Sequence, residues 1–191
     1  MDIKTKLKGA FDLLFLFGRG IHAFSGSKQD ALRSFVIPGV LFPVTLSFGA
    51  LYPPKGMETG YSNSQILTTV ALHAVVSFAL SLAVIFLLAR TFRKSGKFWL
   101  FLEAYNWTGL AIFLVTLPLA QAALFEWIPR EEMDRIFVIA QCFFYVVTAC
   151  IIFRALQLNW QLSGFMAIAT LFVDQTTWDV LFMLQGIPRP W

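Results

Sequence analysis

The sequence predicts an all-α fold, a polytopic membrane bundle of five transmembrane helices with an interfacial amphipathic helix at the N-terminus. Hydrophobic residues make up 58% of the chain and charged residues only 14%, whereas a soluble domain carries about 25% charged residues. Residues 66–88 contain no Asp, Glu, Lys or Arg, and a helix of this length rises ~35 Å, enough to cross a hydrocarbon core of about 30 Å. Four cations and no acid follow within residues 90–97, a pattern typical of the cytoplasmic end of a span.

Residues 1–26 predict the amphipathic helix and a turn, and residues 27–191 predict the transmembrane bundle. A helix over residues 1–22 would separate apolar from polar side chains. The apolar face would hold Ile3, Leu7, Phe11, Leu14 and Gly18, and the polar face Lys4, Lys8 and Asp12. Such a helix is expected at the level of the lipid headgroups, where each cation, Lys6 included, attracts anionic lipid by about 1 kcal/mol. Ser27 and Asp30 then have capping-box spacing, which predicts a new helix.

The other spans are predicted at about 32–52, 98–124, 136–153 and 162–184. Pro38 and Pro43 are expected to kink the first of them. The last one contains the polar sequence DQTTWD, so it is either a fifth full span, which is the favoured interpretation, or a re-entrant pair of half-helices.

The distribution of cations predicts the orientation of the chain. With five spans and the N-terminus in the cytoplasm, eleven cations lie inside and four outside, as the positive-inside rule requires. The inner set is Lys4, Lys6, Lys8, Arg19, Lys28, Arg33, Arg90, Arg93, Lys94, Lys97 and Arg154, and the outer set is Lys55, Arg130, Arg135 and Arg189. We therefore expect an integral protein of a bacterial cytoplasmic (inner) membrane, with its C-terminus outside. A re-entrant last stretch would keep the C-terminus inside.

Polar groups at membrane depth are the candidate functional residues, because each needs a partner or water there. They are His73, Glu103, Asn106, Asp174 and Asp179. Counted at 1.5 Å per residue, His73 lies ~20 Å and Asp174 ~18 Å above the inner boundary. These depths predict a hydrogen bond between the two side chains, provided that the last stretch spans fully. Glu103 would lie only ~8 Å above that boundary. Stripes of small and weakly polar residues, such as Thr69, Ser77 and Ser81 beside His73, are typical of packed membrane helices.

No known catalytic or cofactor motif is apparent in the aqueous segments. The sequence contains no Walker loop, HExxH or GxSxG pattern, and Cys142 and Cys150 are too far apart on one helix for a disulfide. We therefore expect no enzyme, cofactor or metal. The acidic loop at 126–134 is interpreted as solvated, and the cations beside apolar spans indicate a membrane partner rather than nucleic acid.

A family resemblance adds to this interpretation. The sequence FWLFLEAYNW from Phe98, the Pro-containing span, Arg154 and the closing FVDQTTWDVLFML resemble small bacterial membrane proteins of the Yip-domain family, over roughly residues 34–184. The Asp-Leu-Tyr-Gly-Pro motif of eukaryotic members is absent, so their link to small GTPases is not carried over. The resemblance implies a membrane-organising or partner-binding protein without catalysis, and it transfers no site residue.

Three functions follow as hypotheses. The first is a non-catalytic membrane protein that acts by helix packing with itself or with a partner. The second is a small transporter or channel subunit with a polar path along His73, Glu103 and Asp174, which a continuous water-accessible cavity would favour. The third is a lipid-modifying enzyme, for which only Glu103 and His22 are candidates on the inner side.

Overall fold

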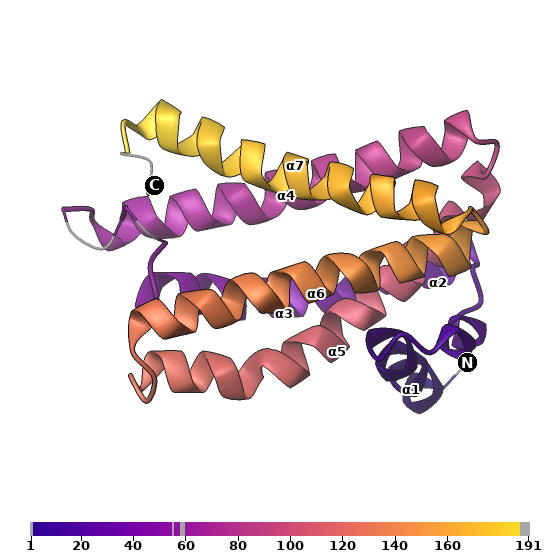
Figure 1. Cartoon of the computed structure of the whole chain (residues 1–191), viewed down its shortest axis with the longest axis horizontal. Coiled ribbons are helices and arrows are strands. Elements are labelled where there is room, and N and C mark those ends of the chain that lie inside the picture. Colours follow the sequence, from indigo (N-terminus) through magenta and orange to yellow (C-terminus); the bar gives the residue numbers. More distant parts are fainter. Residues whose placement is uncertain (1, 55, 58–59, 188–191) are drawn as a thin grey trace.

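The computed structural model describes residues 2–54, 56–57 and 60–187, and the elements in these ranges are all helices, as predicted (Figure 1). Their bounds are α1 Ile3–Leu14, η1 Gly18–Ala23, α2 Lys28–Arg33, α3 Val36–Leu51, α4 Asn63–Thr91, η2 Ser95–Lys97, α5 Phe98–Leu124, α6 Arg130–Leu156 and α7 Trp160–Gln185. Five segments are long and apolar enough to cross a membrane, namely α2 with α3, α4, η2 with α5, α6 and α7. The protein is therefore a polytopic membrane helix bundle.

The five long helices form a closed ring. Each of them packs against two neighbours, in the order α3, α4, α7, α6, α5 and back to α3. Many large apolar side chains on the outside of the ring are exposed, including Val75, Leu87, Ile139 and Phe172, and lipid is the solvent that suits them. Within the described ranges, no further helix lies along the axis of this ring, so only side chains can occupy the space there.

The N-terminal helix is shorter than predicted. It ends at Leu14 instead of continuing to His22, because the chain reverses at Leu16, whose φ is +64°, and continues as the 3₁₀-helix η1. The reversed segment lies against α1 at two glycines. A β-carbon on Gly9 would overlap the Ala23 side chain, and one on Gly20 would overlap the carbonyl oxygen of Gly9. The hairpin can therefore close because neither of these two positions carries a side chain.

The face by which α1 packs also differs from the expected apolar face. Ile3 is 69% exposed, whereas Lys6, Ala10 and Leu13 are buried against α5 and α6. One hydrophobic cluster joins Ala10 and Leu13 to buried residues of the bundle such as Phe101. Only Lys4 and Lys8 of the three lysines on α1 remain exposed, so Lys6 cannot contact lipid headgroups as expected.

The first predicted span begins as two helices, α2 and α3, with a short break between them. Ser27 caps α2 by accepting a hydrogen bond from the Asp30 amide, as predicted, but α2 ends at Arg33 and α3 starts at Val36. Pro38 lies in the first turn of α3, where a missing amide proton is tolerated, and only Pro43 is inside the helix.

The last stretch is a single helix, α7, which runs through DQTTWD without a break. The re-entrant alternative is therefore wrong. Thr177 lies within the sequence that suggested a break, and its hydroxyl donates 2.7 Å to the Val173 carbonyl oxygen of its own helix. This bond satisfies the hydroxyl inside the helix, so the polar sequence requires no interruption.

The cations gather at one end of the bundle. The α4–α5 connection, the α6–α7 connection and the N-terminal hairpin lie together at the right of Figure 1. The eleven cations predicted to be cytoplasmic lie on these segments, on the adjoining α2 or in the last turns of α4 and α6. Arg130 and Arg135 lie at the start of α6, toward the other end, and Lys55 and Arg189 are outside the described residues.

Candidate functional site

The polar seam between α4 and α7 contains the predicted contact. His73 Nε2 lies 3.2 Å from Asp174 Oδ1, and the Ser77 hydroxyl donates 2.6 Å to the same oxygen. The ring of His73 also stacks on Trp178 with a centroid distance of 3.8 Å and an interplanar angle of 15°. The prediction of a His73–Asp174 contact is therefore confirmed, and Trp178 fixes the imidazole from the other side.

The stripe of weakly polar residues on α4 faces α7, as helix packing predicts. Thr69 is fully buried and donates 2.6 Å to Gln185 Oε1, and Ser77 is 7% exposed. Because Ser77 bonds Asp174 at mid-helix and Thr69 bonds Gln185 near the helix end, α4 and α7 are held in register along their length.

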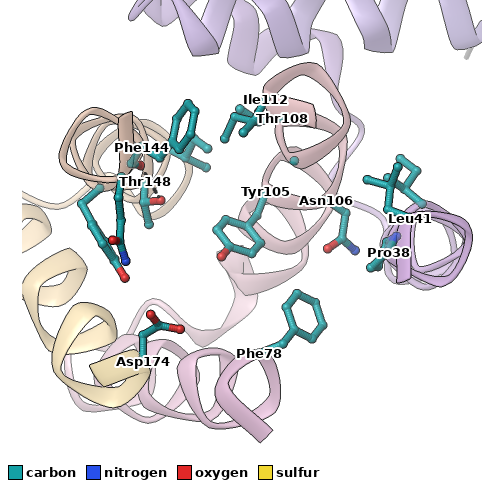
Figure 2. Close-up of a pocket in the computed structure, with 15 residues that line it drawn as sticks. Pro38, Leu41, Phe78, Tyr105, Asn106, Thr108, Ile112, Phe144, Thr148 and Asp174 are labelled. Atoms are coloured by element: carbon teal, nitrogen blue, oxygen red, sulfur yellow. Dashed lines mark hydrogen bonds between the residues drawn. The ribbon is translucent and has the colours of Figure 1, made fainter. Parts of the chain in front are cut away.

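Two adjoining cavities open beside this seam, inside the ring of helices. Their volumes are about 380 Å³ and about 200 Å³, and they share Phe78, Tyr105, Tyr145, Thr148 and Asp174 as lining residues. We call the two cavities together the chamber. All five long helices contribute to it. Figure 2 shows the Asp174 carboxyl group pointing from α7 into the chamber, with Phe78 on α4 and Tyr105 on α5 pointing toward the same space.

Two buried polar atoms on the chamber side of α5 have no hydrogen-bond partner among the described residues. They are Asn106 Oδ1 and Thr108 Oγ1, on side chains that are 4% and 0% exposed, and both residues line the larger cavity. The other end of the Asn106 amide is engaged, since Nδ2 donates 2.8 Å to the Ser34 hydroxyl. An unpaired buried acceptor costs about 1–3 kcal/mol, so these atoms need water or a ligand in the chamber.

The electrostatic character of the chamber is set by few groups. Asp174 and His73 are its acid and its base, the Tyr105 and Tyr145 phenols also face it, and the described lining residues include no lysine or arginine. The rest of the wall combines apolar and aromatic side chains, such as Phe78 and Phe144, with uncharged polar ones, such as Gln141 and Thr148.

Glu103, predicted to lie on the same polar path, belongs to another site. Its side chain is 0% exposed, and Lys6 Nζ of α1 lies 2.8 Å from Oε1. Oε2 accepts hydrogen bonds from the backbone amides of Ser25 at 3.1 Å and Gly26 at 3.0 Å, and the Ser25 hydroxyl oxygen lies 3.2 Å away. The carboxylate is thus enclosed by the N-terminal segment and does not line the chamber. The continuous path His73–Glu103–Asp174 is not formed.

A second acid supports this N-terminal clamp, as we call Lys6, Ser25, Gly26 and Glu103 together. Asp30 on α2 accepts 2.6 Å from the Ser25 hydroxyl and lies 3.8 Å from Lys6 Nζ. The lysine therefore lies between the buried Glu103 carboxylate and the partly exposed Asp30 carboxylate, which compensates the burial of the Lys6 and Glu103 charges.

The remaining predicted residues have peripheral positions. Asp179 is half-buried on α7 and does not line the chamber. At the opposite end from the clamp, the Tyr52 hydroxyl donates 3.0 Å to Asp134 in the acidic region. Within the described ranges, no three histidine, cysteine or acidic side chains are placed to hold a metal ion together.

Sequence reasoning missed several chamber residues. Gln141 and Thr148 lie on a weakly polar stripe of α6 that was visible in the sequence, but Phe78 and Thr108 carried no signal that set them apart from packing residues. The pairing of Lys6 with Glu103 was missed because the N-terminal helix was expected to lie at the lipid headgroups and not against the bundle.

Comparison of the chain with protein-family models, with curated proteins and with solved structures finds no match.

Proposed function

We propose that this protein is a non-catalytic integral membrane protein that binds a small solute in the chamber and acts as a small transporter or as the solute-binding subunit of one. The observation that carries the proposal is the pair of unpartnered buried oxygens, Asn106 Oδ1 and Thr108 Oγ1, in the wall of an intramembrane cavity. Packing alone would not retain them, because apolar replacements in a closed core avoid their cost. A solute or water in the chamber satisfies them.

The proposal takes the second sequence-based hypothesis and removes Glu103 from it. The first hypothesis, a membrane organiser that binds itself or another membrane protein, stays a prediction, as does the Yip-domain resemblance. No specific contact favours the enzymatic alternative, since Glu103 is sealed by Lys6 and His22 is exposed elsewhere.

Access to the chamber from water tests the proposal. The test compares Thr148→Cys, which lines the chamber, with Val146→Cys, which is 43% exposed on the outer face of the same helix. Both are made in a Cys142→Ala/Cys150→Ala background, because these are the native thiols. A thiol reacts with methanethiosulfonates as the thiolate, which lipid disfavours. In lipid nanodiscs, a small neutral hydrophilic methanethiosulfonate should label Thr148→Cys at least about tenfold faster than Val146→Cys.

Equal, slow labelling of the two variants would mean a dry interior and would end the proposal. Labelling from one side of sealed proteoliposomes identifies the side on which the chamber opens, and labelling from both sides supports alternating access.

We further propose that the end of the bundle that carries the N-terminal hairpin faces the cytoplasm of a bacterial inner membrane. The eleven cations on that end support this orientation through the positive-inside rule. A reporter fused after Lys97 should be active only in the cytoplasm. Activity of that fusion outside the cytoplasm would reverse the orientation.

A further inference from the structure

The chemistry of the chamber wall restricts the kind of solute that it suits. The wall presents one carboxylate, Asp174, and no lysine or arginine among the described residues. A charged solute that complements such a wall is a cation. An anion would have to enter an apolar space beside a carboxylate, which Coulomb repulsion at low dielectric opposes.

The hydrogen-bonding groups of Asp174 and Asn106 also favour a cationic solute. The side chains of His73 and Ser77 both contact Asp174 at Oδ1, and the carboxyl group points into the chamber in Figure 2. Across the chamber, Asn106 Oδ1 is an acceptor without a donor. These two oxygens accept hydrogen bonds, so a solute that binds both of them donates N–H or O–H bonds.

Aromatic side chains supply the rest of the surface. Phe78 and Tyr105 are partly stacked, with centroids 6.3 Å apart, and both line the two cavities together with Tyr145. Aromatic faces attract organic cations and pack against methylene groups. A bare inorganic cation binds through several oxygen ligands instead, and Asp174 is the only carboxylate in the described wall.

We propose that the solute is a small organic cation with a primary ammonium group. The ammonium group binds Asp174, the carbon chain packs against the exposed edges of Phe78 and Tyr105, and a second donor group reaches Asn106 Oδ1. The inference rests on the proposed solute-binding function and names its substrate class. The larger cavity, about 380 Å³, falls at the low end of the range of small-molecule sites, roughly 300–1,000 Å³.

Three probes of one size and different charge test the inference on the purified full chain in nanodiscs. They are 4-aminobutanol, 4-hydroxybutyrate and 1,4-butanediol, titrated at constant pH, with sodium chloride as a fourth titrant. The readouts are the midpoint of thermal unfolding and the tryptophan emission, since Trp178 stacks on His73. Only aminobutanol should raise the midpoint and change the emission in a saturable way.

Variants assign the binding to the carboxylate. Asp174→Asn should weaken aminobutanol binding at least about tenfold. The matched control Asp179→Asn, which removes a carboxylate from the same helix outside the chamber, should leave it unchanged. Should Asp174→Asn not fold, the charge preference of the unmodified chain still decides the question.

Equal effects of the three organic probes, a preference for hydroxybutyrate, or the same effect from sodium would each overturn the inference. So would an Asp174→Asn variant that binds aminobutanol normally. If no probe binds while Thr148→Cys still reacts from water, the cation class is wrong and the solute-binding function stands. If no probe binds and Thr148→Cys is unreactive, both proposals are wrong.

Discussion

Glu103 and Asp174 are both carboxylates at membrane depth, but they differ in how fully the protein itself supplies their hydrogen-bond partners. The Glu103 side chain is 0% exposed and both of its oxygens meet donors from the N-terminal segment. The Asp174 side chain is 21% exposed, and its contacts with the His73 and Ser77 side chains converge on one oxygen beside a cavity. A carboxylate that the chain itself saturates holds structure together, whereas one that faces a cavity is available to a solute. The predictions below test this division of roles.

The largest expected effect is at the clamp. Glu103→Ala leaves the Lys6 ammonium buried without its closest partner, and breaking a buried ion pair in this way costs about 3–5 kcal/mol. Chemical denaturation in mixed micelles measures the loss. The double variant Lys6→Met/Glu103→Leu should recover most of it, because no unpaired charge is left. A loss below about 1 kcal/mol for Glu103→Ala would contradict the structural role of the clamp.

The next effect tests the hairpin that delivers Lys6. Gly20→Ala places a β-carbon against the Gly9 carbonyl oxygen, which should cost about 1–3 kcal/mol and make the N-terminal segment sensitive to protease. Gly164→Ala on α7 is the control, because a β-carbon there meets nothing within 4 Å. It should be neutral or stabilise by up to about 1 kcal/mol. Similar behaviour of the two variants in denaturation and proteolysis would mean that the hairpin is not closely packed.

A smaller effect on stability is expected at the chamber. Asp174→Asn keeps an oxygen that accepts from Ser77 at the same place, so we expect a loss of about 1–2 kcal/mol, the difference between charged and neutral hydrogen bonds. The same denaturation assay applies. A loss as large as that of Glu103→Ala would show that Asp174 is also a structural anchor, and the comparison between the two acids would fail.

Asn106→Leu should have the smallest effect on stability but should still weaken binding of the solute. Asn106→Leu removes an unpartnered acceptor and one hydrogen bond to Ser34, so these two changes should cancel to within about 1 kcal/mol. Binding of aminobutanol should nevertheless weaken. Thr116→Val is the control on the same helix, since its hydroxyl bonds the Ile112 carbonyl oxygen at 3.0 Å within α5 and is not part of the chamber wall. Unchanged binding by Asn106→Leu would remove Asn106 from the site.

The spans and the His73–Asp174 contact could be predicted because they depend on quantities that local sequence determines. The rise of a helix is fixed, so counting residues gives the depth of a side chain once the ends of the span are known. The span ends are marked by Arg90 and Arg154, whose charges stay out of lipid.

The clamp and the chamber could not be predicted because they depend on tertiary packing. The reversal at Leu16 occurs in an apolar sequence without glycine or proline at the turn itself, so nothing marks the end of α1. The chamber arises where five helices leave unfilled volume, and residues such as Thr108 read as ordinary packing positions until their neighbours are known. Intramembrane polar residues can be found from the sequence, but the sequence does not show whether the protein supplies all the hydrogen-bond partners of each residue.

Chemical labelling of the carboxyl groups in the protein without substitutions tests this account most directly. A water-soluble carbodiimide with glycinamide converts accessible carboxyl groups to amides, and peptide mass spectrometry reads each acid in the nanodisc-embedded protein, with the exposed Asp2 as the internal standard. The account predicts that Asp174 is modified and that Glu103 is spared. Modification of Glu103 as fast as Asp174, or protection of both, would contradict it.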